Sequence, residues 1–236
     1  MIAHVVLTPS EVDASVVQES TVVVVDVVRA TTTMVEALAN GARAIYPTAS
    51  TEDAVRLATS LGRDDTLLCG ERKGLKVEGF DLGNSPGEYT AEVVQAKRLV
   101  MSTTNGTGAL ALVQEAPRVL AGAFTNLSAV AHAVRNDARV MILCAGRVGR
   151  FALDDALCAG HLLRRLGAGL EMNDAARAVW ELAGAVSPGL DFLAGTEAGK
   201  ALASIGLEGD LAVCGQVDRH GVVPQVRDQA LVAVQG

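Results

Sequence analysis

The chain has 236 residues, of which half are hydrophobic and only 3% aromatic, and its formal net charge is −7. A chain of this length can bury a sizeable core as one domain. The negative charge argues against a nucleic-acid-binding protein, because such proteins need a basic surface. No apolar run is long enough to span a bilayer and no signal peptide is recognisable, so we expect no membrane partner.

The cysteines indicate a reducing compartment. All four are widely spaced and form no C-x-x-C pair, a pattern that disfavours both a zinc site and a disulfide framework. We therefore expect a cytoplasmic protein. The four histidines show no metal-ligand spacing, and no Gly-x-Gly-x-x-Gly motif follows a strand, so a nicotinamide cofactor is not expected. The sequence leaves a homo-oligomer open.

Residues 22–33 predict the centre of the fold. A first strand at residues 5–7 precedes four consecutive valines at 22–25, which are typical of a parallel strand buried on both faces. A carboxylate, a guanidinium and three hydroxyls follow this strand, namely Asp26, Arg29, Thr31, Thr32 and Thr33. A helix then runs to Gly41, a residue suited to a C-terminal cap.

This arrangement favours an anion site. Ligands of open α/β sheets bind at the carboxyl ends of the strands, and the N-terminus of a helix attracts anions. An alternative is that Thr33 and Glu36 form a capping box, which would explain one of the threonines. The capping box leaves Asp26, Arg29 and two further threonines unexplained.

The rest of the chain repeats the order of strand, turn and helix. Further strands are predicted at residues 43–46, 66–69, 98–102, 119–124, 140–144, 211–217 and 222–226. Helices are predicted at 51–61, 86–96, from 109, from 126, over the segment with Asp154 and Asp155, at 173–180 and at 190–205. We expect an α/β fold with α/β/α layers and a mostly parallel or mixed sheet. We take 1–236 as a single domain, with two α/β lobes at 1–124 and 125–236 as the alternative.

Two further segments have the composition of binding loops. Residues 70–84 form a long stretch of charges and glycines between a strand and a helix that Ser85 and Pro86 begin; loops of this length are usually functional. Five residues follow the strand at 98–102, namely Thr103, Thr104, Asn105, Gly106 and Thr107. This turn would present N–H groups to an anion, although Asn-Gly is also ordinary turn chemistry. We expect it to converge with Thr31–Thr33 on one crevice.

These motifs resemble the 2-phosphosulfolactate phosphatase family of coenzyme M biosynthesis. The matching segments cover nearly the whole chain, and the most specific are DVVRATTT at 26–33, GER at 70–72, EGFDLGNSP at 78–86 and TTNGT at 103–107. The resemblance implies a magnesium-dependent acid phosphatase with a mixed α/β fold. Its substrate would be a small anionic phosphate ester such as 2-phosphosulfolactate, which is converted to sulfolactate and phosphate.

The residues can support this chemistry. Magnesium takes oxygen ligands, usually one or two carboxylates with substrate oxygens and waters, and the candidate metal ligands are Asp26, Glu71 and Asp81. Solvated loop charges are the alternative for Glu71 and Asp81. Asp26 and Arg29 are the candidate catalytic residues. The phosphate and a second anionic group would be bound by the threonine turns with Arg29, Arg72, Lys73 and Arg150. For Lys73 a solvated loop charge is the favoured alternative.

Three alternatives stay open. Cys144 and Arg150 have the spacing of a cysteine-dependent phosphatase loop, but Phe151 stands where those enzymes carry a hydroxyl. Asp26 could be a phosphorylated nucleophile, as in haloacid-dehalogenase-type phosphatases, although Val28 replaces their second aspartate. The third alternative is a non-catalytic protein that binds a small anion with the same loops.

Overall fold

Strand β2 (Thr21–Val25) lies inside the sheet, where it pairs in parallel with β7 (Arg118–Gly122) and β8 (Arg139–Cys144). In the computed structural model, which describes residues 1–235, the four valines of β2 are fully buried. Successive side chains of a strand point to opposite faces, so a strand covered on both faces favours an uninterrupted apolar run. The expectation of a central parallel strand is confirmed.

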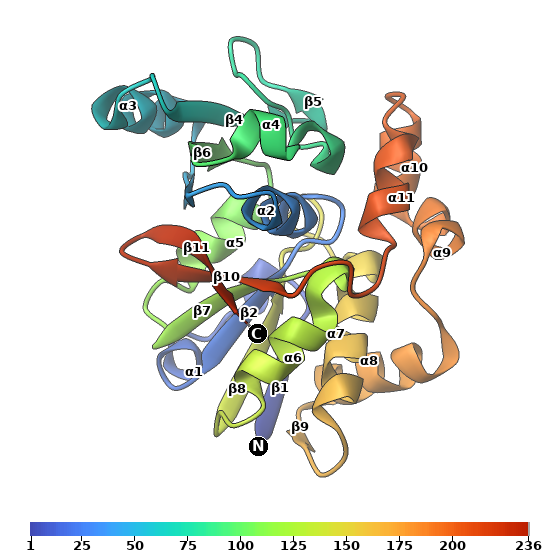
Figure 1. Ribbon diagram of the computed structural model, residues 1–236. Coiled ribbons are helices and arrows are strands. Elements are labelled where there is room, and N and C mark those ends of the chain that lie inside the picture. Colours follow the sequence, from blue (N-terminus) through green and yellow to red (C-terminus); the bar gives the residue numbers. More distant parts are fainter. Residues whose placement is uncertain (236) are drawn as a thin grey trace.

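All the strands belong to one mixed sheet (Figure 1). It has 11 strands, in the order β5 (Leu75–Lys76), β4 (Thr66–Arg72), β6 (Arg98–Ser102), β3 (Ala44–Pro47), β11 (Ala230–Gln235), β10 (Val222–Arg227), β7, β2, β8, β1 (Ile2–Val6) and β9 (Glu171–Met172). The hairpin β10–β11 is antiparallel to both neighbours, and β5 is antiparallel to β4. The other pairs are parallel, which confirms the predicted α/β fold with a mostly parallel, mixed sheet.

Helices cover both faces of the sheet (Figure 1). They are α1 (Ala14–Gln18), α2 (Ala30–Ala39), α3 (Thr51–Leu61), α4 (Ala91–Val94), α5 (Gly106–Leu112), α6 (Leu127–Val134), α7 (Leu153–Leu166), α8 (Asp174–Ala185), α9 (Leu190–Gly195), α10 (Glu197–Ala203) and α11 (Leu211–Cys214). Short 3-10 helices lie at Pro9–Glu11, Pro86–Glu88, Phe124–Asn126 and Glu208–Asp210.

The alternating side chains of β2 divide the core. Val23 and Val25 belong to a cluster with buried residues of α6, α7 and α8. Val22 and Val24 belong to a second cluster, with buried residues of α2 and α5. A third, smaller cluster packs α3 against β4 and β6. Burying large aliphatic side chains stabilises a fold by roughly 1.5–3 kcal/mol each, so both faces of the central strands contribute.

Strands from before and after residue 124 alternate in the sheet. β2 and β7 precede that position, whereas their neighbours β8 and β10 follow it. The division into lobes at 1–124 and 125–236 stays a prediction.

Several predicted elements were wrong at the C-terminal end. Residues 211–217 form the short helix α11 and a loop in place of the predicted strand, because Leu211 and Cys214 face the core at helical spacing. A short apolar run fits either a strand or a helix. The predicted helix at 190–205 is two helices, and Thr196 caps the second by accepting from the Gly199 amide. Strand β11 was not predicted.

One predicted helix cap and one alternative were also wrong. Helix α2 begins at Ala30, so Thr33 lies inside it and does not form the alternative capping box, and the Glu36 carboxylate pairs with Arg219 and His220 Nε2. The Ser85 hydroxyl donates to Asp210 and caps nothing, and the predicted helix at 86–96 is a 3-10 turn followed by the short α4. Side chains from distant segments bind these groups instead, and local sequence patterns do not reveal such partners.

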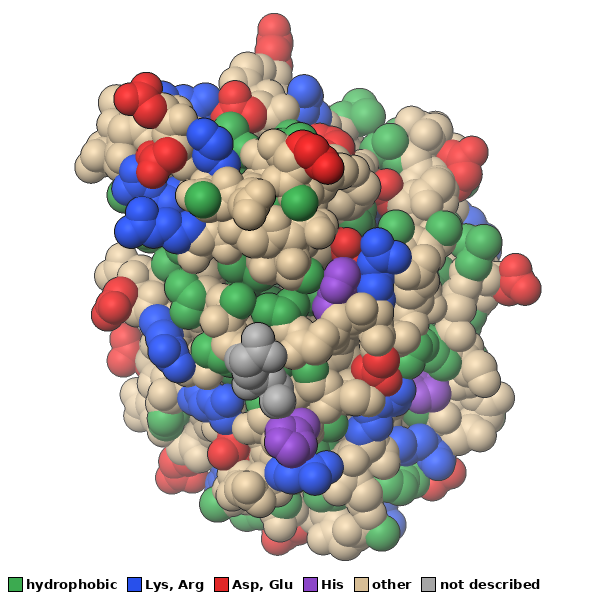
Figure 2. All heavy atoms as spheres, in the orientation of Figure 1, with side chains coloured by type: hydrophobic (Ala, Val, Ile, Leu, Met, Phe, Trp, Pro, Cys, Tyr) green, Lys and Arg blue, Asp and Glu red, His purple; other side chains and the backbone are tan. Residues whose placement is uncertain are grey.

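The surface is mixed in character. Figure 2 shows acidic and basic side chains interspersed on one face of the molecule. No helix within residues 1–235 combines the length and the apolar composition that a bilayer crossing needs.

Candidate active site

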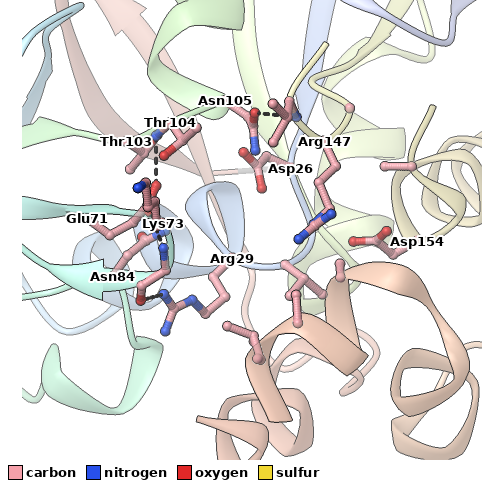
Figure 3. Close-up of a pocket in the computed structure, with 18 of the residues that line it drawn as sticks. Asp26, Arg29, Glu71, Lys73, Asn84, Thr103, Thr104, Asn105, Arg147 and Asp154 are labelled. Atoms are coloured by element: carbon pink, nitrogen blue, oxygen red, sulfur yellow. Dashed lines mark hydrogen bonds between the residues drawn. The ribbon is translucent and has the colours of Figure 1, made fainter. Parts of the chain in front are cut away.

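A pocket lies where four strand ends meet helix α10. Its polar walls come from the turns after β2, β4, β6 and β8, and Figure 3 shows many of these side chains directed toward one space. The polar lining residues are Asp26, Arg29, Glu71, Lys73, Asn84, Thr103, Thr104, Asn105, Arg147, Asp154, Asp155 and Ser204. The turns after β2 and β6 therefore meet at one crevice, as expected for the carboxyl ends of strands in an open sheet.

The three threonine hydroxyls of the β2–α2 turn are occupied within the fold. Thr31 and Asp26 hydrogen-bond each other, since the Thr31 hydroxyl donates to the Asp26 carbonyl and accepts from its amide. The Thr32 hydroxyl donates to the Val27 carbonyl, and that of Thr33 to the Asn84 carbonyl. All three threonines are fully buried and none lines the pocket. Their predicted contact with phosphate stays a prediction, and here they shape the turn that holds Asp26.

Arg29 lines the pocket but its guanidinium is committed to protein groups. One nitrogen lies 2.6 Å from Asp210 Oδ2 and donates to the Ser85 hydroxyl at 3.0 Å, and the other donates to the Gly74 carbonyl at 2.6 Å. The side chain is only 3% exposed. Arg29 therefore ties the turn after β2 to the β4–β5 hairpin and to the C-terminal segment.

Four carboxylates line the pocket, and two of them hold the backbone. Glu71 accepts from the amides of Gly74 and Thr104, both at 2.7 Å. Asp155 accepts from the amides of Val27 and Gly146, at 2.8 and 3.0 Å. Each thereby ties two neighbouring turns together.

The other two carboxylates, Asp26 and Asp154, retain capacity for a ligand. Asp26 accepts only a long bond of 3.3 Å from the Ala30 amide, through Oδ1. Neither carboxylate forms an ion pair with any residue in the described range 1–235. Both side chains are buried, with Asp154 in the first turn of α7.

Burial of these carboxylates raises their pKa values, and neighbouring charges add to the effect for Asp26 and Asp155. Burial raises the pKa of Asp26 to about 7, and the charges of Asp154 and Glu71 add to this effect. Burial also raises the pKa of Asp154 to about 6, against the backbone N–H groups and Arg147, which favour its charged form. The pKa of Asp155 rises well above its ordinary value, through burial and then the charges of Asp154 and Asp26. A bound cation would relieve this repulsion.

The cations of the pocket differ from those that the motifs suggested. Lys73 lines it as predicted. Arg72 instead donates to the Glu71 and Ser102 carbonyls and to the Ser102 hydroxyl. Arg150 is exposed outside the pocket, and Arg147 of the same loop lines it. Figure 3 shows the Arg147 guanidinium reaching toward Asp154.

The remaining predicted residues lie around the pocket. Thr103, Thr104 and Asn105 line it, whereas Gly106 and Thr107 belong to the first turn of α5 behind them. Asp81 is not a lining residue, because its carboxylate pairs with Arg63 at 2.7 Å and accepts from the Leu68 amide. This geometry separates Asp81 from Asp26 and Glu71, the other two predicted metal ligands.

Besides Ser204, four polar residues of the pocket were missed by sequence reasoning. Arg147 lies in the loop after β8, and Asp154 and Asp155 lie in the first turn of the helix that follows this loop, so the strand-end rule pointed to this segment. The fourth is Asn84, which is 5% exposed and whose Oδ1 has no hydrogen-bond partner among the described residues. The signal that the sequence offered was the position of Asn84 in the long loop. In the structure, its unpartnered buried oxygen indicates a ligand site more strongly than the composition of the loop does.

Cys144 is buried at the end of β8 and does not line the pocket. Burial raises the pKa of its thiol well above the ordinary value, and the nearby Asp155 adds to this. A thiol in such surroundings stays protonated and is a poor nucleophile. The geometry therefore disfavours the cysteine-dependent alternative.

The pocket offers oxygen ligands that suit a hard cation, although they do not all lie close together. No group of three or more His, Cys, Asp or Glu side chains lies close enough to hold a metal ion within residues 1–235. Magnesium needs only one or two carboxylates besides substrate oxygens and waters. Asp26 and Asp154, which both line the pocket, are two such carboxylates.

Comparison with known proteins gives one consistent result. A family model described as 2-phosphosulpholactate phosphatase matches residues 6–229. A protein from Synechococcus sp. (strain JA-3-3Ab) is 42% identical over 221 residues, which are 91% of each chain. One from Pseudothermotoga lettingae is 40% identical, over 88% of this chain and 89% of its own. One from Clostridium beijerinckii is 35% identical, over 95% and 96%. All three are named probable 2-phosphosulfolactate phosphatase.

Proposed function

The chain belongs to the 2-phosphosulfolactate phosphatase family and is a phosphoric monoester hydrolase, and we propose that its strand-end pocket hydrolyses a small phosphate ester with magnesium as cofactor. The resemblance in the motifs is thereby confirmed. The proposed substrate is 2-phosphosulfolactate, after the name of the relatives, and its products are sulfolactate and phosphate. The observation that carries this proposal is the pair of carboxylates, Asp26 and Asp154, that retain capacity for a ligand.

The proposed magnesium ligands are Asp26 and Asp154, which both line the pocket and retain capacity for a ligand. This set replaces the earlier one of Asp26, Glu71 and Asp81, because Glu71 is engaged with two amides and Asp81 with Arg63. The bound cation would neutralise charge on the phosphoryl oxygens, which is the main requirement of phosphoryl transfer.

The residues around the carboxylates would orient the ester. Lys73 and the turn that begins with Thr103 and Thr104 lie on the same side of the pocket. Glu71 connects them, because its carboxylate accepts from the Thr104 amide and Lys73 follows it two residues later. We propose that this side binds the phosphate. Arg29 is a positioning residue here, since its guanidinium holds three segments of the pocket together through three hydrogen bonds.

The overall reaction adds water across the ester. A bond forms between the water oxygen and phosphorus, the bond between phosphorus and the ester oxygen breaks, and a proton passes to the leaving alkoxide. Ala201 and Leu202 of helix α10, with Ile205 just beyond its end, cover one side of the pocket. An apolar wall of this kind limits the access of bulk water and strengthens the interactions inside. We place the enzyme in the cytoplasm, in keeping with four buried, free cysteines.

Phosphate release is the direct test. Purified protein should hydrolyse 2-phosphosulfolactate with magnesium, and EDTA should abolish this activity until magnesium is restored. Turnover that EDTA does not affect would overturn the metal. Specific binding of the ester without phosphate release, with magnesium present, would instead identify a non-catalytic anion-binding protein.

A further inference from the structure

Besides Arg29, two cations line the pocket, and these two, Lys73 and Arg147, lie on opposite sides of Asp26. Figure 3 shows Lys73 beside Glu71 and Thr104, whereas Arg147 reaches in from the β8–α7 loop toward Asp154. The Arg147 guanidinium makes no hydrogen bond and no ion pair with any of the residues that the structure describes. A half-buried guanidinium without a carboxylate partner is ready to bind an anion.

The loop that carries Arg147 is held in a costly conformation. Gly146 has φ +67°, and a Cβ at this position would lie 2.4 Å from the Arg150 carbonyl oxygen. The amides and carbonyls of Arg147 and Arg150 bond each other at 2.8 and 3.0 Å. Val148 adopts φ +52° and is 70% exposed, which is an outlier for a β-branched residue. Burial of Val148 does not explain this conformation.

A contact with the opposite turn fixes the loop. The Asn105 side-chain oxygen accepts from the Val148 amide at 3.0 Å. Asn105 belongs to the turn after β6, which supplies the proposed phosphate side of the pocket. The same turn therefore helps to hold the position of Arg147 relative to the phosphate. Strain of this kind is maintained where it orients a functional group.

We propose that Arg147 binds a second anionic group of the substrate, so that the pocket selects phosphate esters carrying a carboxylate or sulfonate a few bonds from phosphorus. Asn105 is a positioning residue for Arg147. This inference rests on the proposed function, which names an ester with such groups but assigns none of them to a residue. The guanidinium fork matches the oxygens of either group.

Four phosphate esters can show which anionic group of the substrate Arg147 binds. 2-Phosphosulfolactate carries a carboxylate and a sulfonate, 2-phospholactate only a carboxylate, the phosphate ester of 2-hydroxyethanesulfonate only a sulfonate, and phenyl phosphate neither. Arg147→Gln should lower kcat/KM for 2-phosphosulfolactate by about tenfold to a hundredfold, mainly through KM, as expected for a lost charge-assisted bond. Its effect on phenyl phosphate should be at least about tenfold smaller. The single-anion ester that shows the larger loss identifies the bound group.

Two variants complete the test. Arg150→Gln removes the same charge from the same loop but outside the pocket, and it should change the ratio between esters less than about twofold. Asn105→Ala should shift the ratio of activities between esters in the same direction as Arg147→Gln does. The loss of activity in the double variant should be smaller than the sum of the losses in the two single variants, because both substitutions remove the same interaction. A purely structural role of Asn105 would not change the ratio between esters.

The outcomes are distinct from those of the proposed function. Equal losses on all four esters, or no loss, would overturn the role of Arg147 while leaving the phosphatase intact. If the wild-type protein hydrolyses none of them, the proposed function fails, and calorimetric binding of sulfolactate still tests Arg147. Wild-type affinity that falls about tenfold or more in Arg147→Gln would support the inference, and an unchanged affinity would overturn it.

Discussion

Two turns of the pocket follow neighbouring parallel strands and differ in what they leave free. The turn after β2 is rich in polar groups, but Thr31, Thr32 and Thr33 all bond the backbone and Arg29 pairs with Asp210. The turn after β8 looks sparser and yet presents Arg147 and Asp154 to the pocket. The density of polar residues in a motif therefore does not show which groups can meet a ligand, because buried polar groups must first be satisfied within the fold.

The largest expected effect concerns Asp26, the one group of the β2 turn that retains capacity for a ligand. Asp26→Asn keeps the shape but removes the charge that a hard cation needs. We expect kcat to fall at least about a hundredfold and magnesium affinity to fall with it. Phosphate release and calorimetric titration with magnesium measure the two quantities.

Asp81→Asn is the matched control, because it removes the same charge from a carboxylate outside the pocket. Its kcat should stay within a few-fold of wild type, although the lost pair with Arg63 would lower stability somewhat. Full activity in Asp26→Asn would show that the β2 turn has only a structural role.

The second effect tests how closely α5 must approach Asp26. A Cβ on Gly106 would lie 2.8 Å from Asp26 Oδ2 and 2.6 Å from the Ala30 Cβ. Gly106→Ala should therefore displace the carboxylate and lower kcat by about tenfold to a hundredfold, since small misplacements of catalytic groups are costly.

Gly108→Ala is a control two residues further along the same helix. A Cβ there meets nothing within 4 Å, so we expect unchanged activity and a stability gain of about 0.5–1 kcal/mol from helix propensity. Equal activity of the two variants would show that the contact between Gly106 and Asp26 does not matter for turnover.

Much of this architecture could be predicted from local patterns. The valine run of β2 and the cap of α3 at Ser50, which accepts from the Asp53 amide, follow from rules that act within a few residues. The strand-end rule also placed Asp26 and the turn at Thr103 at one crevice.

What could not be predicted depends on partners distant in sequence. Arg29 lines the pocket, but the sequence did not reveal that Asp210, which is 181 residues away, pairs with its guanidinium. A capping box with Glu36 was the alternative for this turn, but His220 binds Glu36. Arg147 and Arg150 are equivalent in a local pattern, and only the folded loop shows which of them enters the pocket. The hydrogen-bond and ion-pair partners of such groups are set by the tertiary fold.

The third prediction uses the burial of two carboxylates, Asp26 and Asp154, in the pocket. The pKa values of Asp26 and Asp154, about 7 and about 6, lie above the ordinary value near 4. A carboxyl group whose pKa is raised by folding binds protons more tightly in the folded state, so its stabilising contribution is lost as the pH rises through the folded pKa. Metal-free protein should therefore unfold at a lower temperature at pH 8 than at pH 5.5.

We expect this difference to be at least about 3 °C in EDTA, and magnesium should reduce it by binding the ionised carboxylates. Thermal unfolding followed by circular dichroism measures it. Asp26→Asn should flatten the pH dependence, because one of the raised carboxyl groups is gone. A wild-type melting temperature that rises from pH 5.5 to pH 8 in EDTA would contradict the assignment.

The smallest expected effect on activity belongs to Cys144, where the β8 turn begins. If its thiolate attacked phosphorus, Cys144→Ser would abolish turnover and EDTA would have little effect, since that chemistry needs no metal. The thiol is fully buried and burial raises its pKa, so we expect the opposite pattern. Serine there should cost roughly 1–3 kcal/mol of stability, because its hydroxyl is more costly to bury than a thiol. Activity per folded molecule should stay within a few-fold of wild type and remain sensitive to EDTA. A folded but inactive Cys144→Ser, beside a wild-type enzyme that EDTA does not inhibit, would transfer the catalytic role from Asp26 to the β8 turn.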